Sequence, residues 1–228
     1  INITSFSYKK GADIFLLSVK KNKNYFQLKI NVKGKIFHID SKYSTKSFIK
    51  NILACVSTIF ILNLDLNKIK KKLIDFKVPE GRGDIKIIKK FNKRFKFIDE
   101  SYNASPLSMT TAINNMNFYK DNKNHRKLVF LGDMLELGKK TKKFHKALSV
   151  TINKSNIDKV FVCGKYIRET FFGLTASKKG KAFNNIQEAY SHFSKILDNN
   201  DLLMVKGSNA TGLNIFSKNI KKGQINAI

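Results

Sequence analysis

The sequence contains no tryptophan, two cysteines and two prolines among its 228 residues. Cys55 lies inside an apolar stretch and Cys163 ends another, and neither belongs to a Cys-x-x-Cys pair or to the dense spacing of a disulfide framework. Both are therefore predicted to be buried thiols. The four histidines are scattered and show no metal-binding spacing, so we expect no metal ligands here and a reducing, cytoplasmic compartment.

Long uncharged apolar runs are also missing. The longest candidate, Ile52 to Leu64, is interrupted by polar residues and is shorter than the roughly 18 apolar residues that a transmembrane helix requires. We therefore predict no membrane insertion. The chain opens at Ile1 with strand-like residues rather than a signal peptide, so we expect it to be part of a longer protein.

Acidic residues are scarce, with 16 Asp and Glu against 44 Lys and Arg, which gives a formal charge of +28. Such a balance is typical of proteins that bind nucleic acid or anionic membranes. However, the lysines are spread over every predicted element, and the surplus accompanies abundant Ile, Asn and Phe, as AT-rich coding would produce. We predict a solvated basic surface without a nucleic-acid partner, and a basic nucleic-acid-binding module is the alternative.

The first part of the chain alternates apolar and polar residues. This alternation over residues 13–40 predicts a β-hairpin, and helical spacing then begins at Ser47 and again at Asp65. Two further strand-like runs, Ile85 to Phe91 and Phe95 to Ile98, are joined by a polar turn. We assign all of these elements to a first domain.

From Ser105 onward, helices and strands take turns. Ser105 and Pro106 are typical of a helix N-cap and first helical position. Short apolar strands are predicted at residues 128–131, 159–162 and 202–205. Because these strands alternate with helices and run into glycine-containing loops, we predict an α/β fold with a mainly parallel, Rossmann-like sheet that binds ligands at its carboxyl edge.

Four motifs carry the functional signal. They are VPEGRGD at residues 78–84, DESYNASPLSM at 99–109, LGDMLELG at 131–138 and VKGS at 205–208. In this order and spacing they resemble the Mur ligase family, and within it the branch that adds a dipeptide. The resemblance implies that residues 1–104 are the C-terminal half of the central ATP-binding domain and that residues 105–228 are the C-terminal domain.

The resemblance also implies an activity. The parent enzyme would join D-alanyl-D-alanine to UDP-N-acetylmuramoyl-tripeptide, using ATP and Mg²⁺, in peptidoglycan precursor synthesis. The tripeptide carboxylate would attack the γ-phosphate, and the dipeptide amine would then displace phosphate. A different amino acid ligase of the Mur or folylpolyglutamate type, or a nucleotide-binding regulatory domain, is the alternative.

The catalytic residues themselves stay unassigned. No G-x-x-x-x-G-K-[ST] phosphate loop occurs in the chain. In the family, this loop, the magnesium-binding acids and a carbamylated lysine lie upstream of the matching segment. We therefore expect the chain alone to be an inactive, monomeric part of a ligase whose metal ligands lie elsewhere.

Arg82 is the candidate phosphate ligand. It stands between Gly81 and Gly83, so a planar, permanently charged fork is presented on a backbone that can approach phosphate closely. The resemblance gives this arginine contact with the ATP phosphates. Asn51 matches an asparagine that reads adenine through its amide, although Ser47 replaces a histidine frequent in the family, so an ordinary helix residue is the alternative.

Asp99 and Glu100 end a predicted strand, where carboxylates commonly hold ribose hydroxyls. The resemblance places Glu100 at the ribose position. Tyr102 and Asn103 follow in a predicted interdomain hinge and are further candidates for nucleotide contact. The alternative is that both carboxylates only cap the turn.

Two loops carry the candidate dipeptide contacts. Asp133 and Glu136 follow the first predicted parallel strand, and Lys206 and Ser208 follow the last. Loops at neighbouring strand ends can face each other, so opposite charges there suit a zwitterionic dipeptide. Asn209 stands where the family frequently has an arginine, which is a departure from the pattern.

Overall fold

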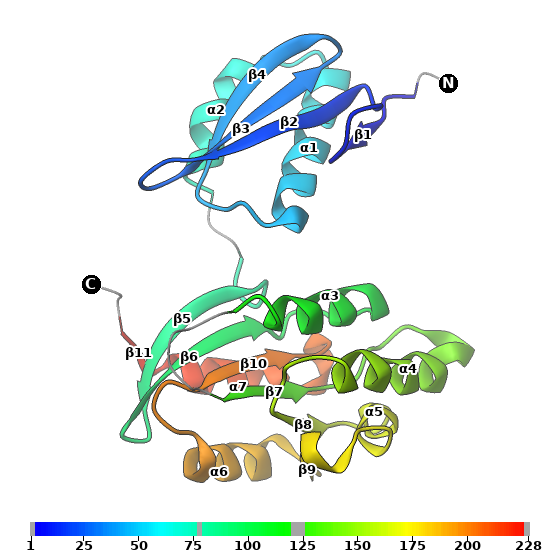
Figure 1. The fold of residues 1–228 in the computed structure, drawn as a ribbon, viewed down its shortest axis with the longest axis vertical. Helices are drawn as coiled ribbons and strands as arrows, with labels where there is room; N and C mark the ends of the chain where they lie inside the picture. The colour runs from blue at the N-terminus through cyan, green and yellow to red at the C-terminus, as the bar shows by residue number, and fades with distance from the viewer. Residues whose placement is uncertain (1–2, 77–78, 120–125, 226–228) are drawn as a thin grey trace. The chain divides into compact units, whose positions relative to one another are not determined.

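The computed structural model describes residues 3–76, 79–119 and 126–225 of the chain. Two compact units, residues 1–77 and 78–228, make up the protein (Figure 1). Within the described segments, no helix is both long enough and apolar enough to cross a membrane.

The first unit combines one sheet with two helices. Its elements are β1 (Phe6–Ser7), β2 (Ile14–Lys21), β3 (Phe26–Val32), β4 (Lys35–Ser41), α1 (Lys46–Ile61) and α2 (Leu66–Ile74). Strands β2, β3 and β4 form an antiparallel meander, and β1 pairs in parallel with β2. Lys33 and Gly34 both have positive φ in the turn between β3 and β4, so the predicted hairpin is confirmed.

One face of this sheet packs against α1. Leu28 and Ile30 of β3 are buried in one cluster with Leu53 and Val56 of α1. Cys55, in contrast, is exposed, so the prediction of a buried thiol at this position is wrong. The surrounding apolar residues concealed that position 55 falls on the outward side of the helix while its neighbours face the sheet.

Side-chain caps fix where helices begin in both units. Thr45 and Asp65 each accept a hydrogen bond from a first-turn amide, so α1 starts slightly before the predicted Ser47 and α2 starts as predicted. Ser105 forms a capping box at the start of α3, with Pro106 in the first turn. The predicted start of this helix is therefore confirmed.

The second unit is built on a larger sheet. Its strands are β5 (Asp84–Lys90), β6 (Lys93–Glu100), β7 (Lys127–Leu131), β8 (Lys159–Cys163), β9 (Lys179–Phe183), β10 (Leu202–Lys206) and β11 (Gln224–Ile225). Its α-helices are α3 (Pro106–Met116), α4 (Thr141–Asn153), α5 (Ile167–Phe172), α6 (Ile186–Ile196) and α7 (Leu213–Lys221). The strand order among described residues is β11-β5-β6-β10-β7-β8-β9. Strands β6 to β9 in this order are parallel, whereas β5 and β11 are antiparallel, so the predicted mainly parallel α/β sheet is confirmed.

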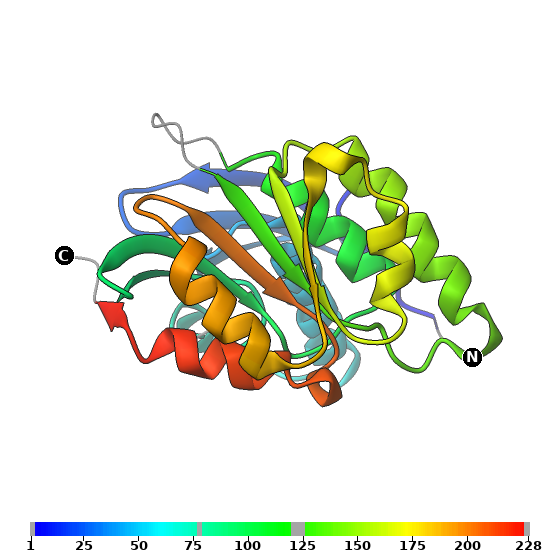
Figure 2. The same ribbon diagram turned by 90° about the horizontal axis from the view of Figure 1, so that it is seen from below.

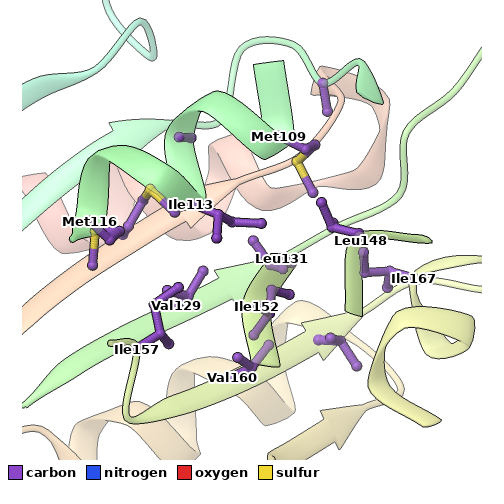
Figure 3. Close-up of a cluster of buried hydrophobic side chains, with 14 of the residues drawn as sticks. Met109, Ile113, Met116, Val129, Leu131, Leu148, Ile152, Ile157, Val160 and Ile167 are labelled. Atoms are coloured by element: carbon purple, nitrogen blue, oxygen red, sulfur yellow. The ribbon is translucent and has the colours of Figure 1, made fainter. Parts of the chain in front are cut away.

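Helices cover both faces of this sheet (Figure 2). On one face, Val129 and Leu131 of β7 pack with helices α3, α4 and α5, and Met109 and Ile113 of α3 lie above them (Figure 3). On the other face, Phe130 of β7 packs with the aromatic side chains of α6 and α7. Because alternate residues of one strand face opposite layers and both layers are covered, the central strands β7, β8 and β10 are mainly apolar.

The predicted boundary at residues 104/105 is wrong. The chain divides into its compact units between residues 77 and 78, and β6 pairs with β10 from Leu202 opposite Lys96 to Lys206 opposite Glu100. The sequence of an antiparallel hairpin does not indicate which sheet the hairpin joins. The prediction that β5 and β6 belong to the first domain was wrong for this reason. The hinge predicted around Tyr102 therefore lies inside the second unit.

The corrected boundary predicts which part of the chain folds alone. Residues 78–228 should unfold in one cooperative urea transition followed by circular dichroism. Residues 105–228 should not, because they lack β5 and β6, leave the edge of β10 unpaired and remove the buried Phe95 and Phe97. A cooperative transition of equal midpoint from the shorter piece would contradict the boundary.

Candidate functional site

In the sheet of the second unit, the chain connections run in opposite directions on the two sides of the β7–β10 pair. From β7 the chain proceeds to β8 on one side, whereas from β10 it proceeds past β6 to β11 on the other. The loops after these two strands are joined by hydrogen bonds from Gly132 N to Lys206 O (2.8 Å) and from Ser208 N to Asp133 O (3.0 Å). Such a switch point at the carboxyl edge is where open α/β sheets bind ligands.

Glu100 and Lys206 form an ion pair at this edge. They are register partners at the ends of β6 and β10, and Lys206 Nζ lies 2.9 Å from Glu100 Oε2 and 3.0 Å from the carbonyl of Asn103. The Lys206 side chain is 3% exposed and that of Glu100 is 25% exposed. The residues predicted separately for ribose and dipeptide therefore meet, and the buried ammonium is engaged within the protein.

Asp99 points to the opposite face of β6. Its Oδ2 lies 2.8 Å from Lys221 Nζ, and its Oδ1 accepts hydrogen bonds from the Ser101 hydroxyl (2.7 Å) and amide (3.1 Å). Burial alone would raise the pKa of Asp99, but the hydrogen bonds from Lys221 and Ser101 outweigh it and hold the pKa below its ordinary value. These contacts give Asp99 a structural role in this unit.

The loop around Arg82 lies against the end of β6. Gly81 and Gly83 have φ of 75° and 94°, which side-chain-bearing residues rarely adopt. The Gly83 amide donates to the Asp99 carbonyl (2.7 Å), and the Tyr102 amide donates to the Gly81 carbonyl (3.3 Å). A Cβ at Gly83 would stand 3.2 Å from Glu100 Oε1, so the loop and this carboxylate are neighbours.

Arg82 and Tyr102 stack at the surface of this loop. The guanidinium carbon is 4.3 Å from the centre of the Tyr102 ring, and both residues are exposed. A stacked arginine keeps its outer N–H donors available for an anion. The structure thus brings together Arg82, Tyr102 and Glu100, three of the residues predicted for nucleotide binding.

Asn103 and Asn51 occupy different settings. Asn103 is exposed and its Oδ1 accepts from the Ala104 amide at 2.7 Å, which fixes the turn before α3. Asn51 is exposed on α1 and belongs to the first unit. Its predicted contact with adenine stays a prediction.

Asp133 is buried and serves as an anchor. Its carboxylate accepts hydrogen bonds from the amides of Lys165 (3.0 Å), Tyr166 (3.0 Å) and Ile167 (2.7 Å). A carboxylate at the first turn of a helix is stabilised by the free amides and by the helix dipole. The loop after β7 is thereby tied to the start of α5. The Asp133 carboxylate, predicted to contact the dipeptide, is already hydrogen-bonded to three backbone amides.

Ser208 and His145 fix the same loop from two sides. The buried Ser208 hydroxyl accepts from the Leu135 amide at 3.1 Å. The buried His145 ring accepts from the Met134 amide at Nε2 (3.0 Å) and lies 2.8 Å from the Thr141 carbonyl at Nδ1, which requires the proton on Nδ1. The imidazole therefore has a structural role, because it links the loop after β7 to the first turn of α4.

Glu136 differs from its neighbours in this loop. It is exposed and has a positive φ of 63°, which is uncommon for a residue with a side chain. Among the four residues predicted for the dipeptide, Asp133, Lys206 and Ser208 are buried and engaged, whereas Glu136 faces solvent.

Sequence reasoning missed Lys221. Its helix, α7, was not predicted, although Leu213, Phe216 and Ile220 show the helical spacing that announces it. No pattern in the sequence indicates that the last residue of this helix pairs with Asp99, because the contact depends on the sheet order. In the described part of the chain, no group of three or more His, Cys, Asp or Glu side chains is arranged to hold a metal ion.

The Glu100–Lys206 pair predicts a large effect of one substitution. Lys206→Met should lower the free energy of unfolding by about 3 kcal/mol, because it leaves a partly buried carboxylate and a carbonyl without their donor. Lys93→Met is the matched control, since Lys93 pairs with Asp198 at the surface and should cost less than about 1 kcal/mol. Equal urea midpoints for the two variants would contradict a buried pair at β10.

The lowered pKa of Asp99 predicts how the free energy of unfolding depends on pH. A carboxyl group whose pKa is lower in the folded state contributes stability above its unfolded pKa and loses it as the pH falls through the folded value. The free energy of unfolding of residues 78–228 should therefore fall as the pH drops below 3.8, the ordinary aspartate pKa. Asp99→Asn should show a shallower pH dependence in this range by urea titration. An unchanged slope would rule out this contribution.

Comparisons with known proteins identify the family of the chain. The family described as "Mur ligase, glutamate ligase domain" matches residues 85–209. The chain is 31% identical over 222 residues to the UDP-N-acetylmuramoyl-tripeptide--D-alanyl-D-alanine ligase of Buchnera aphidicola subsp. Baizongia pistaciae, covering 96% of the chain and 46% of that protein. It is 29% identical over 212 residues to the Rickettsia prowazekii protein of the same name, covering 93% and 46%. The chain thus spans about half the length of these relatives.

Solved structures share the fold. MurF from Acinetobacter baumannii has a TM-score of 0.74 at 21% identity, covering 96% of this chain and 47% of that one. The MurF ligase from Thermotoga maritima, solved in complex with ADP, has a TM-score of 0.70 at 20% identity, covering 96% and 49%. The family match covers more than half of the chain, and this chain therefore belongs to the Mur ligase family.

Proposed function

We propose that the chain is the C-terminal part of an ATP-dependent ligase that joins D-alanyl-D-alanine to UDP-N-acetylmuramoyl-tripeptide. The observation that carries the proposal is the grouping of Arg82, Tyr102 and Glu100 at the carboxyl edge of the second unit. Relatives with the corresponding name extend the support from fold to reaction class. We further propose that the protein is a cytoplasmic monomer.

Arg82 is proposed to bind the phosphates. Its guanidinium rests on the Tyr102 ring, so one flat face is occupied while the edge with its N–H donors is free to form a bidentate contact. The surrounding glycines let the anion approach the backbone closely. ATP supplies the phosphoryl group that activates the substrate carboxylate, and Arg82 orients that group through charge.

Glu100 is proposed to hold the ribose. Lys206 engages Oε2, which leaves Oε1, the atom beside Gly83, able to accept from a hydroxyl. The ion pair also fixes the orientation of the carboxylate, as a ligand-binding acceptor requires. Tyr102 and Asn103 adjoin this position, and Asn51 of the first unit is proposed to read the adenine.

The dipeptide is proposed to bind near the loops after β7 and β10. Glu136 is the exposed carboxylate there and suits the dipeptide amine. Asp133, Ser208 and Lys206 are proposed to act behind it, because their present partners hold the two loops in register. Mg²⁺ is proposed to be held by residues outside this chain.

The proposal is tested on a longer protein, in which this chain is joined to the half that it lacks relative to the relatives. Arg82→Ala should weaken the handling of ATP by about 2 to 3 kcal/mol, measured as the change in kcat/KM for ATP, because a charge-assisted phosphate contact is lost. Arg94→Ala is the control, since Arg94 is exposed at the opposite end of β6.

The 228-residue chain assayed in parallel should neither hydrolyse ATP nor form the peptide bond, because it has no phosphate loop. An Arg82→Ala enzyme with unchanged ATP dependence would remove Arg82 from the site. Turnover by the chain alone would contradict the assignment as an incomplete part of the enzyme.

A further inference from the structure

We propose that Lys221 is a positioning residue that holds the Arg82 loop against the end of β6. This inference rests on the phosphate role proposed for Arg82 and deepens it. Lys221 ends α7 and lies 141 positions from Glu80, which opens the same loop. It belongs to none of the four motifs that indicated the function.

One ammonium group bridges two carboxylates here. Lys221 Nζ is 2.8 Å from Asp99 Oδ2 and 3.1 Å from Glu80 Oε2. The side chain of Lys221 is 11% exposed and that of Asp99 is 2% exposed, whereas that of Glu80 is 73% exposed. The contact therefore runs from the buried end of β6 to the surface loop, two residues before Arg82.

Both ends of the Arg82 loop are held at Asp99. On one side, Lys221 ties Glu80 to Asp99, and on the other the Gly83 amide bonds to the Asp99 carbonyl. Gly81 and Gly83 would otherwise give the loop backbone wide conformational freedom, and ordering it costs entropy. Lys221 reduces that freedom from outside the loop, which keeps Arg82 stacked on Tyr102.

The charges suit a positioning role and not a second phosphate ligand. Burial would lower the pKa of Lys221, but its hydrogen bonds to Asp99 and Glu80 raise the pKa, so the ammonium stays charged. Its charge is shared between two carboxylates, whereas the Arg82 fork faces solvent. A phosphate at this edge would meet Arg82, and Lys221 would act through the loop.

The test uses amide hydrogen exchange and NMR on the 228-residue chain without nucleotide. In Lys221→Met, the Gly83 and Tyr102 amides should exchange about tenfold faster because the loop opens locally. The Arg82 side-chain Nε–H resonance should also lose the upfield shift caused by the Tyr102 ring. Lys218→Met, one turn earlier and exposed, should change neither signal. Lys221→Arg should restore both, since it keeps the charge and the reach.

A second variant protects the test from misfolding. Glu80→Gln removes only the surface arm of the bridge, so the chain should stay folded while the same two amides exchange faster and the Arg82 shift decreases. If the amides and the Arg82 resonance are unchanged in Glu80→Gln and in any folded Lys221→Met, the positioning role is overturned. Because no nucleotide is present, this outcome is independent of whether Arg82 binds ATP.

Discussion

Strand β6 ends in two adjacent carboxylates, and each is held by a lysine on an opposite face of the sheet. Glu100 pairs with Lys206 from the neighbouring β10, and Asp99 pairs with Lys221 from α7. Alternation along a strand makes this division unavoidable, because neighbouring side chains point to opposite faces. Both carboxylates therefore depend on the arrangement of the sheet, with β10 beside β6 and α7 against the opposite face, for their partners.

Both ion pairs connect segments that are distant in sequence, and this explains which features could be predicted. Strands β7, β8 and β10, the capped start of α3 at Ser105 and the parallel sheet follow from local patterns that the structure confirms, whereas β9 was not predicted. The place of the β5–β6 hairpin does not, since its membership in the larger sheet depends on β10, about a hundred residues later. Cys55 shows the same limit at smaller scale, because an apolar run does not by itself reveal which side of a helix is covered.

Lysine serves in this unit as a structural residue as well as a surface charge. Lys127 Nζ donates to the Met116 carbonyl at the end of α3, and Lys178 Nζ donates to the carbonyls of Ser155 and Ile157. Burial lowers the pKa of Lys127, while the charge of Asp158 opposes this shift. A long apolar stem with a charged tip can satisfy carbonyls at helix ends while it covers apolar surface. Part of the basic composition thus has a role in the fold that requires no anionic partner.

The motifs lie together at one edge of the sheet, but they do not indicate which side chains of that edge are exposed. Asp99, Asp133, Lys206 and Ser208 all belong to recognised motifs, and all are buried with protein partners. Arg82, Tyr102 and Glu136 belong to the same motifs and are exposed. Since a buried polar group must be paired to be tolerated, the first set builds the edge and the second set is available to a ligand. In the proposed function, the chemistry of this edge therefore depends on the small exposed group, and the buried pairs hold the strand ends and loops that carry it.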